Sequence, residues 1–180
     1  GPDDAPVTLV EYGDFECPHC GAAYPIVEEV RREMGPRLRF VYRYFPLTEM
    51  HPHAMHAAEA AEAAGTQGKF WQMHAMLFEH QDALEDADLV QYAKALHLDG
   101  KRFASELASE AHVARIREDI RSGIRSGVNG TPTFFINGVR YDGSWEESDL
   151  LAALEDAAPK AKAAVPSEGP SRSWAAPGTG

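Results

Sequence analysis

The sequence has only two cysteines among its 180 residues, and both lie in the tetrapeptide Cys17-Pro18-His19-Cys20. A framework of structural disulfides is therefore excluded, because such frameworks need several cysteines spread along the chain. Basic residues are also few, since 17 Lys and Arg stand against 28 Asp and Glu, which gives a formal net charge of −11. This charge disfavours nucleic acid or an anionic membrane surface as a partner.

The sequence also shows no long apolar run and no basic-plus-apolar pattern of the kind that a leader has. No stretch approaches the ~18–20 apolar residues of a membrane span, so we expect no membrane insertion by this segment. The chain begins at Gly1-Pro2 without an initiator Met, which predicts that its start is trimmed. We expect an extracytoplasmic location, the periplasm or cell envelope, if a leader or anchor preceded this start, and a cytoplasmic one otherwise.

What the sequence does contain favours one compact domain, because 44% of its residues are hydrophobic and 180 residues can bury a sizeable core. Residues 7–12 alternate and are β-branched, which predicts a strand, and a helical pattern covers 21–34. Gly35-Pro36 ends that helix, and residues 38–45 predict a second, buried strand. Together these elements predict a β-α-β unit with two parallel strands.

A block without any strand pattern follows, from about residue 48 to 128. Its Ala-rich run at 54–64 has high helix propensity. We expect the whole block to form an all-helical subdomain inserted into the α/β domain. Its last helix is predicted by one apolar face, formed by Val113, Ile116, Ile120 and Ile124.

The pattern returns to strands near the C-terminal end. Residues 133–136 and 139–141 predict two strands, and Asn137-Gly138 between them is a strong signal for a tight hairpin turn. Ser144 and Glu147 fit a capping box at the start of a last helix.

From residue 158 the chain is rich in Ala, Pro, Gly and Ser and shows no periodicity. Such a composition cannot bury enough apolar surface to order a chain. We therefore divide the sequence into a domain at 1–157, with the helical insertion inside it, and a disordered tail or linker at 158–180.

The two cysteines lie three residues apart, about one helical turn, so both sulfurs project from one side of a helix start. A helix N-terminus stabilises a thiolate. We expect a redox site in which Cys17, with an exposed sulfur, is the nucleophile and Cys20, one turn inward, is the resolving thiol. Pro18 fits the first helical turn, and His19 offers a cationic or hydrogen-bond-donating ring that tunes the thiolate.

Two segments resemble the DsbA-like thiol–disulfide oxidoreductases of the thioredoxin superfamily: residues 11–20, EYGDFECPHC, and residues 130–138, GTPTFFING. The resemblance extends from residue 4 to about 157. It implies an α/β, thioredoxin-like fold with the order β-α-β, helical insertion, β-β-α. The segment His51-Pro52-His53 and the Ala-rich helix after it are also similar to thioredoxin-like domains attached to bacterial sodium/proton antiporters.

The resemblance assigns roles to further residues. It implies a cis Thr131–Pro132 peptide bond that faces the cysteines, with the Thr131 backbone pairing with an extended substrate segment. It also implies that Glu11 is a buried acid that accepts the Cys20 proton and has a pKa raised by burial. The alternative for Glu11 is a polar residue on an edge strand. The expected partners are cysteine-containing protein substrates and a redox partner that regenerates the cysteine pair, and no cofactor is expected.

The direction of electron flow stays open at this point. The Pro18-His19 pair matches strongly oxidising members of the family, which favours oxidation of substrates. Thr131 stands where valine is common in those members and is closer to the isomerases and reductases. The alternatives to an oxidase are therefore a reductase or isomerase that uses the same residues, and a redox-inactive adaptor that binds peptides.

A metal site is a further alternative, built from the two cysteines and nearby histidines. His51, His53 and His56 invite this interpretation, because the last two can share a helix face. Histidines at a helix start are more often surface or packing residues, so we expect no metal. We expect Asp14 and Glu16 to form a solvated acidic rim that slightly opposes thiolate formation.

Overall fold

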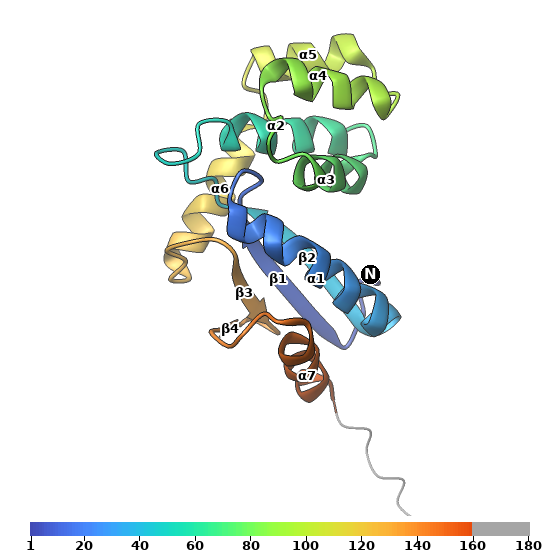
Figure 1. Ribbon diagram of the computed structural model, residues 1–180, viewed down its shortest axis with the longest axis vertical. Coiled ribbons are helices and arrows are strands. Elements are labelled where there is room, and N and C mark those ends of the chain that lie inside the picture. Colours follow the sequence, from blue (N-terminus) through green and yellow to red (C-terminus); the bar gives the residue numbers. More distant parts are fainter. Residues whose placement is uncertain (160–180) are drawn as a thin grey trace, which may run out of the picture.

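The structure is a computed structural model that describes residues 1–159, so the predicted tail or linker at 158–180 falls almost entirely outside the described residues. The elements follow the predicted order: a β-α-β unit, a block of helices, a β-hairpin and a last helix (Figure 1). The helical block therefore separates the two halves of one sheet along the sequence. Within residues 1–159, none of the helices combines the length and the apolar character that a membrane span requires.

A four-stranded sheet forms the centre of the molecule, with the strand order β2-β1-β3-β4. β1 (Val7–Gly13) pairs in parallel with β2 (Leu38–Tyr44), which confirms the predicted parallel pair. β3 (Thr133–Ile136) runs antiparallel to both β1 and β4 (Val139–Tyr141). β1 is therefore a central strand with β2 on one side and β3 on the other, and the cysteines follow its C-terminal end.

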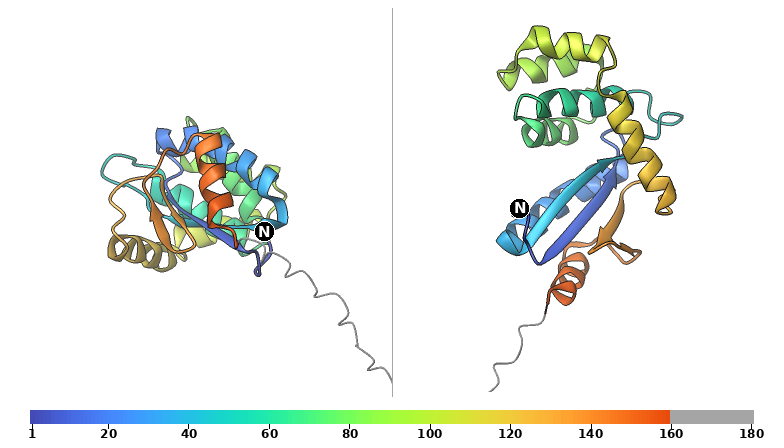
Figure 2. Two further views of the ribbon diagram at one scale, coloured as in Figure 1. Left: turned by 90° about the horizontal axis from the view of Figure 1, so that it is seen from below. Right: turned by 180° about the vertical axis from the view of Figure 1, so that it is seen from behind.

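Helices cover both faces of this sheet (Figure 2). α1 (Pro18–Met34) and α7 (Glu147–Ala157) contact each other on one face. α6 (Val113–Arg125) lies against the other face, where its Ile120 packs beside Tyr12 of β1. In β1 and β2 the side chains on one face are all buried, whereas most of those on the other face are half-buried or exposed, so the second face is only partly covered.

The helical insertion stacks at one end of the sheet (Figure 1). It consists of α2 (Ala54–Gly65), α3 (Phe70–Glu79), α4 (Asp86–Ala95) and α5 (Gly100–Ala108). α2 contacts each of the other three helices, and its buried residues are almost all alanines. Small side chains let helix backbones approach closely, so the Ala-rich run lies at the centre of the insertion.

A buried carboxylate anchors α6 to the sheet. Asp119 is fully buried and forms ion pairs with Arg43 of β2 and Arg115 of α6, both at 2.7 Å. It also accepts a hydrogen bond from the Tyr44 backbone N–H at 3.3 Å, so its charge is compensated in the interior. Ile124, expected on the buried face, is 61% exposed, so that part of the predicted face is wrong.

The turn between β3 and β4 is Asn137-Gly138, as predicted, with φ values of 49° and 82°. Positive φ at both central residues is what a type I′ hairpin turn requires. The Asn137 side chain also accepts a hydrogen bond from the Thr8 backbone N–H at 2.8 Å. The predicted capping box is wrong, because α7 begins after Glu146, whose backbone N–H donates to the Ser144 hydroxyl at 3.1 Å.

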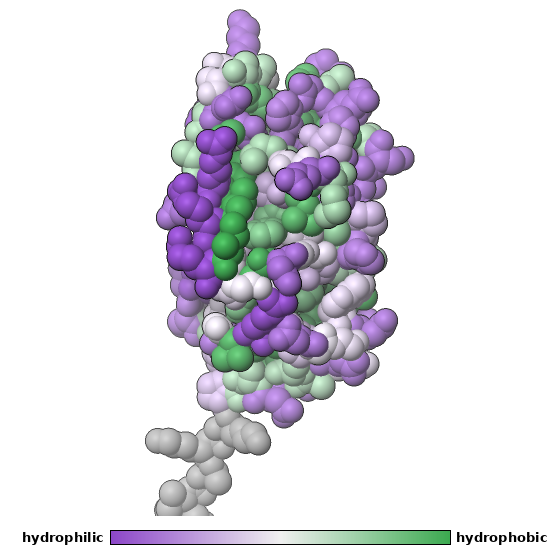
Figure 3. Space-filling model, turned by 90° about the vertical axis from the view of Figure 1, so that its left-hand side faces the viewer, coloured by the Kyte–Doolittle hydropathy of each residue, from purple (hydrophilic) through white to green (hydrophobic). Residues whose placement is uncertain are grey.

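Figure 3 shows one face of the molecule, on which hydrophobic side chains are flanked by charged and polar ones. The large apolar side chains that are most exposed among the described residues lie on five different segments of the chain. They are Met50, Trp71, Val90, Ile124 and Val139.

Candidate active site

The two cysteines lie at the turn from β1 into α1. Cys17 is the N-cap residue of α1, Pro18 is the first residue of the helix, and Cys20 lies in its first turn. The helix begins about one turn earlier than the predicted range 21–34, because proline needs no hydrogen-bond partner there and its φ suits that position. The two thiols are not joined, so the structure describes the reduced form of the pair.

Cys17 is more enclosed than the sequence predicts. The residue is 4% exposed and Cys20 is completely buried, so the prediction of an exposed Cys17 sulfur is wrong for this form. Pro18 and His19, which follow Cys17, are exposed, and Thr131 is half-buried. The reactive sulfur therefore lies just below the surface, beside the two residues that separate the cysteines.

The loop before β3 brings Thr131 against Cys17. The Cys17 thiol donates a hydrogen bond to the Thr131 carbonyl oxygen, with an S···O distance of 3.4 Å. The Thr131–Pro132 peptide bond is cis, as the resemblance implies. The Thr131 hydroxyl is buried and has no hydrogen-bond partner while Cys17 is a thiol, so it can donate to the Cys17 sulfur when that group ionises. The two segments that carry the family resemblance are distant along the chain, and residues of both thus meet at one sulfur.

These surroundings lower the pKa of Cys17 from its ordinary value of 9.0 to about 5. The largest cause is a hydrogen bond from the Cys20 thiol. Burial acts in the opposite direction, whereas the Thr131 hydroxyl and the backbone N–H groups of Cys20 and His19 lower the pKa further. Donors directed at a sulfur stabilise its charged form. Cys17 is therefore the thiol that ionises at neutral pH, and the thiolate is the reactive form in disulfide exchange.

Cys20 has the opposite tendency. Burial, and the hydrogen bond that it donates to Cys17, raise the pKa of Cys20 well above its ordinary value. The charge of Glu11 acts in the same direction. The two thiols titrate as a coupled pair, and in the singly protonated pair Cys20 holds the proton.

Glu11 lies beneath the cysteines on the central strand β1, so the interpretation as an edge-strand residue is wrong. It is 3% exposed. Burial and the charge of Glu28 raise the pKa of Glu11 from 4.5 to about 8, and Arg31 offsets part of this rise. Cys17 also contributes to the rise, since a thiolate nearby disfavours a second negative charge. A carboxyl group with this pKa can give or take a proton near neutral pH.

Asp14 does not belong to a solvated rim, and that prediction is wrong. It is 2% exposed, and its carboxylate accepts hydrogen bonds from the backbone N–H groups of Glu16 and Leu47, both at 2.8 Å. Its Oδ2 lies 2.7 Å from Nδ1 of His51. Burial lowers the pKa of His51, but the hydrogen bond and charge of Asp14 outweigh burial and raise it. Asp14 therefore ties the active-site turn to the loop after β2.

The three histidines considered as metal ligands are held apart by different partners. His51 pairs with Asp14, His56 pairs with Asp86 at 2.7 Å, and the His53 backbone N–H donates to Glu16 at 2.7 Å. Neither these histidines nor the cysteines belong to a set of three converging ligand atoms among residues 1–159.

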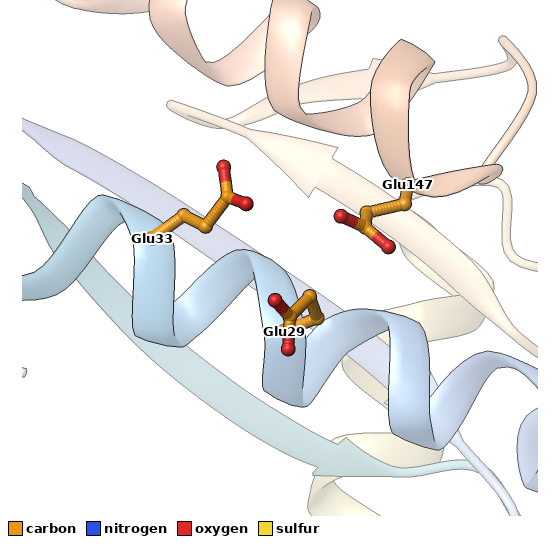
Figure 4. A group of neighbouring side chains, drawn as sticks. All are labelled: Glu29, Glu33 and Glu147. Carbon is orange, nitrogen blue, oxygen red and sulfur yellow. The ribbon is translucent and has the colours of Figure 1, made fainter.

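One acidic cluster does have converging ligand atoms. Glu29 and Glu33 of α1 and Glu147 of α7 lie close together (Figure 4), with one oxygen of each within 4.8 Å of the others. Glu29 also pairs with Arg32. Exposed carboxylates of this kind commonly occur without a metal, so the cluster does not by itself make a metal site.

Two contacts of the site are not predicted by the sequence. Asp14 is expected on a solvated rim because no local pattern reports its burial. Gln81, between α3 and α4, donates hydrogen bonds to backbone carbonyls of the active-site turn. No local pattern marks this glutamine, because its contact with the turn depends on how the insertion docks.

The Thr131→Val variant is expected to raise the pKa of Cys17, because valine keeps the shape of threonine but removes the hydroxyl that can donate to the thiolate. We expect a rise of about 0.5–1 unit, which corresponds to a net hydrogen-bond contribution of about 1 kcal/mol. Titration of the thiolate ultraviolet absorbance in the reduced protein measures it. Thr133→Val is the matched control, since the Thr133 hydroxyl donates to the Gly130 carbonyl instead. An unchanged Cys17 pKa in Thr131→Val contradicts this assignment.

Comparison with known proteins places most of the chain in one family. A family model described as thioredoxin matches residues 1–156. Among curated proteins, the Na(+)/H(+) antiporter NhaA 1 of Salinispora arenicola is 50% identical over 157 residues, which covers 87% of this chain and 24% of that protein. The antiporter of the same name from Mycobacterium sp. (strain KMS) is 45% identical, with 86% and 26% covered. The chain therefore spans about a quarter of the length of these relatives.

Solved structures share the fold. BdbD from Bacillus subtilis, in its oxidised form, superposes with a TM-score of 0.78 at 23% identity, covering 87% of this chain and 90% of that one. A thioredoxin-like oxidoreductase from Silicibacter pomeroyi DSS-3 superposes with a TM-score of 0.74 at 29% identity, covering 84% and 86%. These comparisons confirm both the predicted thioredoxin-like fold with a helical insertion and the resemblance to antiporter-attached domains.

Proposed function

This chain belongs to the thioredoxin family, and from that membership we propose that it is a thiol–disulfide oxidoreductase acting on cysteine-containing protein substrates. One observation carries the proposal. Two thiols lie one helical turn apart, and the hydrogen bond from Cys20 helps to lower the pKa of Cys17 to about 5. Two inert core cysteines would not require different pKa values, whereas disulfide exchange requires one thiolate and one thiol that holds a proton.

We propose that the exchange runs through a mixed disulfide at Cys17. In the oxidising direction, a substrate thiolate attacks the Cys17 sulfur of the Cys17–Cys20 disulfide, a new S–S bond forms, and Cys20 leaves and takes up a proton. A second substrate thiolate then attacks the substrate sulfur of the mixed disulfide, and Cys17 leaves as a thiolate. The substrate loses two electrons and the cysteine pair gains them. A redox partner that itself carries a disulfide then reoxidises the pair.

Glu11 is the proposed source of the Cys20 proton. Its pKa of about 8 keeps most of its population protonated at neutral pH, and it lies close enough to Cys20 for its charge to raise the pKa of that thiol. The proton passes from Glu11 to Cys20 as the sulfur leaves, and returns when Cys20 attacks in the reverse direction. Pro18 and His19 are proposed to tune the thiolate, since the His19 backbone N–H helps to lower the pKa of Cys17.

Oxidation of substrates is the proposed direction. A thiolate of low pKa is a good leaving group, so the disulfide form of such a pair is a strong oxidant. The Thr131 carbonyl beside Cys17 supports the proposal that the backbone before Pro132 pairs with an extended substrate segment. The alternative direction is reduction or isomerisation with the same residues, which the family resemblance of Thr131 favours.

The names of the curated relatives raise a second question, namely what this segment does within a longer protein. They are antiporters, and this chain matches about a quarter of each. The segment contains the cysteine pair, so we propose that it is an oxidoreductase part of such proteins, with its thiol chemistry separate from ion transport.

The reduction potential of the protein tests the proposed function and its direction. We expect equilibration against defined ratios of reduced and oxidised glutathione to give a potential near the ~−120 mV of DsbA, whereas a value near the ~−270 mV of thioredoxin supports the reductase alternative. A pair that does not equilibrate with glutathione contradicts both directions.

Covalent trapping provides a second test with a clear outcome. The Cys20→Ser variant is expected to accumulate mixed disulfides with reactive protein thiols or disulfides, because Cys17 still forms the bond and no thiol remains to resolve it. Non-reducing gel electrophoresis and mass spectrometry identify the adducts. Cys17→Ser/Cys20→Ser is the matched control and should give none. Absence of adducts from both variants contradicts the proposed mechanism.

A further inference from the structure

One side chain of the helical insertion reaches the active-site turn. The Gln81 side-chain nitrogen donates hydrogen bonds to two backbone carbonyl oxygens, that of Phe15 at 2.8 Å and that of Cys17 at 2.9 Å. The amide has two N–H bonds, and both are used. A single residue of the insertion therefore holds two carbonyl groups of the strand-to-helix turn.

These two carbonyl groups lie on either side of the reactive residue. The peptide unit between Phe15 and Glu16 is held at both ends, since its C=O accepts from Gln81 and its N–H donates to Asp14 at 2.8 Å. The C=O of Cys17 also accepts the first hydrogen bond of α1, from the Gly21 N–H at 3.0 Å. The backbone is thus fixed both before and after the Cys17 side chain.

Gly21 leaves the space that the Gln81 amide occupies. A Cβ atom on Gly21 would lie 1.9 Å from Oε1 of Gln81, which is far inside contact distance. Gly21 does not have a positive φ, so its backbone conformation does not require glycine. A side chain at position 21 would therefore displace the Gln81 amide from the active-site turn.

We propose that Gln81 is a positioning residue for Cys17: its amide holds the peptide groups around Cys17 so that the N–H groups of the first helical turn point at the sulfur. The N–H groups of His19 and Cys20 are among the donors that stabilise the thiolate. If the turn rotates, these N–H groups no longer point at the Cys17 sulfur. The relevance of Gln81 to catalysis rests on the proposed function, but its effect on the Cys17 thiolate does not.

The proposal makes the acidity of Cys17 depend on the helical insertion. Cys17 and its helix belong to the β-α-β unit, whereas Gln81 lies between two helices of the insertion. If the insertion moves away from the turn, the two carbonyl groups lose their donor and the thiolate loses part of its support. The insertion therefore contributes to the reactivity of the site as well as covering it.

Three variants test this contact: Gln81→Ala, Gly21→Ala and the two combined. Titration of the thiolate absorbance in the reduced full chain is the readout. We expect each single variant to weaken the acidity of Cys17 by about threefold or more, the effect of about one net hydrogen bond. In the double variant the acidity of Cys17 should be no lower than in Gln81→Ala alone, because the Gln81 side chain is gone and the alanine methyl at position 21 has room. Gln91→Ala, at an exposed glutamine of α4, is the control and should titrate as the wild type does.

An unchanged Cys17 pKa in Gln81→Ala, with a native circular dichroism spectrum, overturns the proposal, as do additive effects of the two single variants. If Gln81→Ala does not fold, Gln81→Glu replaces the donating NH₂ group by oxygen at nearly constant shape and should also weaken the acidity. The titration uses no substrate. A protein that shows these shifts but does not exchange disulfides refutes the proposed function alone, and one that exchanges disulfides without the shifts refutes this inference alone.

Discussion

The Cys17→Ser variant is expected to lose disulfide exchange completely and to lack the stability of about 2–3 kcal/mol that the Cys17 thiolate contributes to the reduced protein between pH 5 and pH 7. Loss of exchange follows because Cys20 is completely buried and its raised pKa keeps it a thiol. Serine preserves the size of the side chain but does not ionise at these pH values. Both effects therefore report the same thiolate.

The sign of the stability effect follows from the direction of the pKa shift. Folding lowers the pKa of Cys17 from 9.0 to about 5, so the folded chain releases this proton at lower pH than the unfolded chain does. Cys17 therefore contributes stability to the reduced protein that grows as the pH rises from about 5 towards 9 and is lost as the pH falls through 5. Each pH unit between 5 and 7 adds about 1.4 kcal/mol to the contribution of Cys17, and screening by nearby solvent reduces the total to about 2–3 kcal/mol.

Urea unfolding of both proteins under reducing conditions, below pH 5 and at pH 7, measures this difference. Cys20→Ser is the control, because its hydroxyl can still donate to the thiolate, so it should keep most of the pH-dependent gain while losing turnover. The same free energy disfavours the oxidised form, and two pKa units correspond to about 60 mV of added oxidising power. Identical pH dependence in wild type and Cys17→Ser means that the thiolate is not stabilised by the fold.

The second large effect is expected from Glu11→Gln, which should stabilise the protein by about 3 kcal/mol at pH 7 while slowing exchange at least about tenfold. Folding raises the pKa of Glu11 from 4.5 to about 8, mainly because burial disfavours its charged form. The unfolded chain therefore ionises at this residue over a pH range in which the folded chain does not. Glutamine has nearly the shape of the protonated acid and removes that penalty.

The two pKa values of Glu11, in the unfolded and the folded chain, set the pH range in which Glu11→Gln differs from the wild type in stability. Below pH 4.5 Glu11 is neutral in both states, and Glu11→Gln should match the wild type in stability. The Glu11 contribution to the stability of the wild type then falls by about 1.4 kcal/mol for each unit as the pH rises from 4.5 to about 8, and the variant lacks this loss. The difference becomes constant above about pH 8.

Exchange slows in Glu11→Gln because glutamine cannot transfer a proton to or from Cys20. Stopped-flow measurement of the oxidation of a dithiol peptide, together with denaturant unfolding across pH 4 to 9, gives both quantities. Glu118→Gln removes an exposed carboxylate on α6 and should change neither. A Glu11→Gln variant that is less stable than the wild type at pH 8 means that Glu11 is charged and compensated in the folded protein.

The sequence predicts the architecture well because local patterns encode it. Alternation in β1, the helical spacing after it and the Asn137-Gly138 turn each depend on residues that are close in the chain. The predicted order of elements and the parallel β1–β2 pair are therefore confirmed. The errors at Ile124 and Ser144 have the same origin, because the position of a helix on the sheet, and the residue at which it starts, depend on tertiary contacts.

The candidate site likewise has features that local sequence predicts and features that depend on tertiary contacts. The spacing of Cys17 and Cys20, at a strand-to-helix turn, is a local property, so residue order alone is enough to predict a cysteine pair at a helix start. Long-range packing, by contrast, encloses Cys17, brings Thr131 and Gln81 into contact with it and buries Asp14. Burial and hydrogen bonds between distant segments set the pKa of each group, and neither exists until the helical insertion and the hairpin pack against the turn.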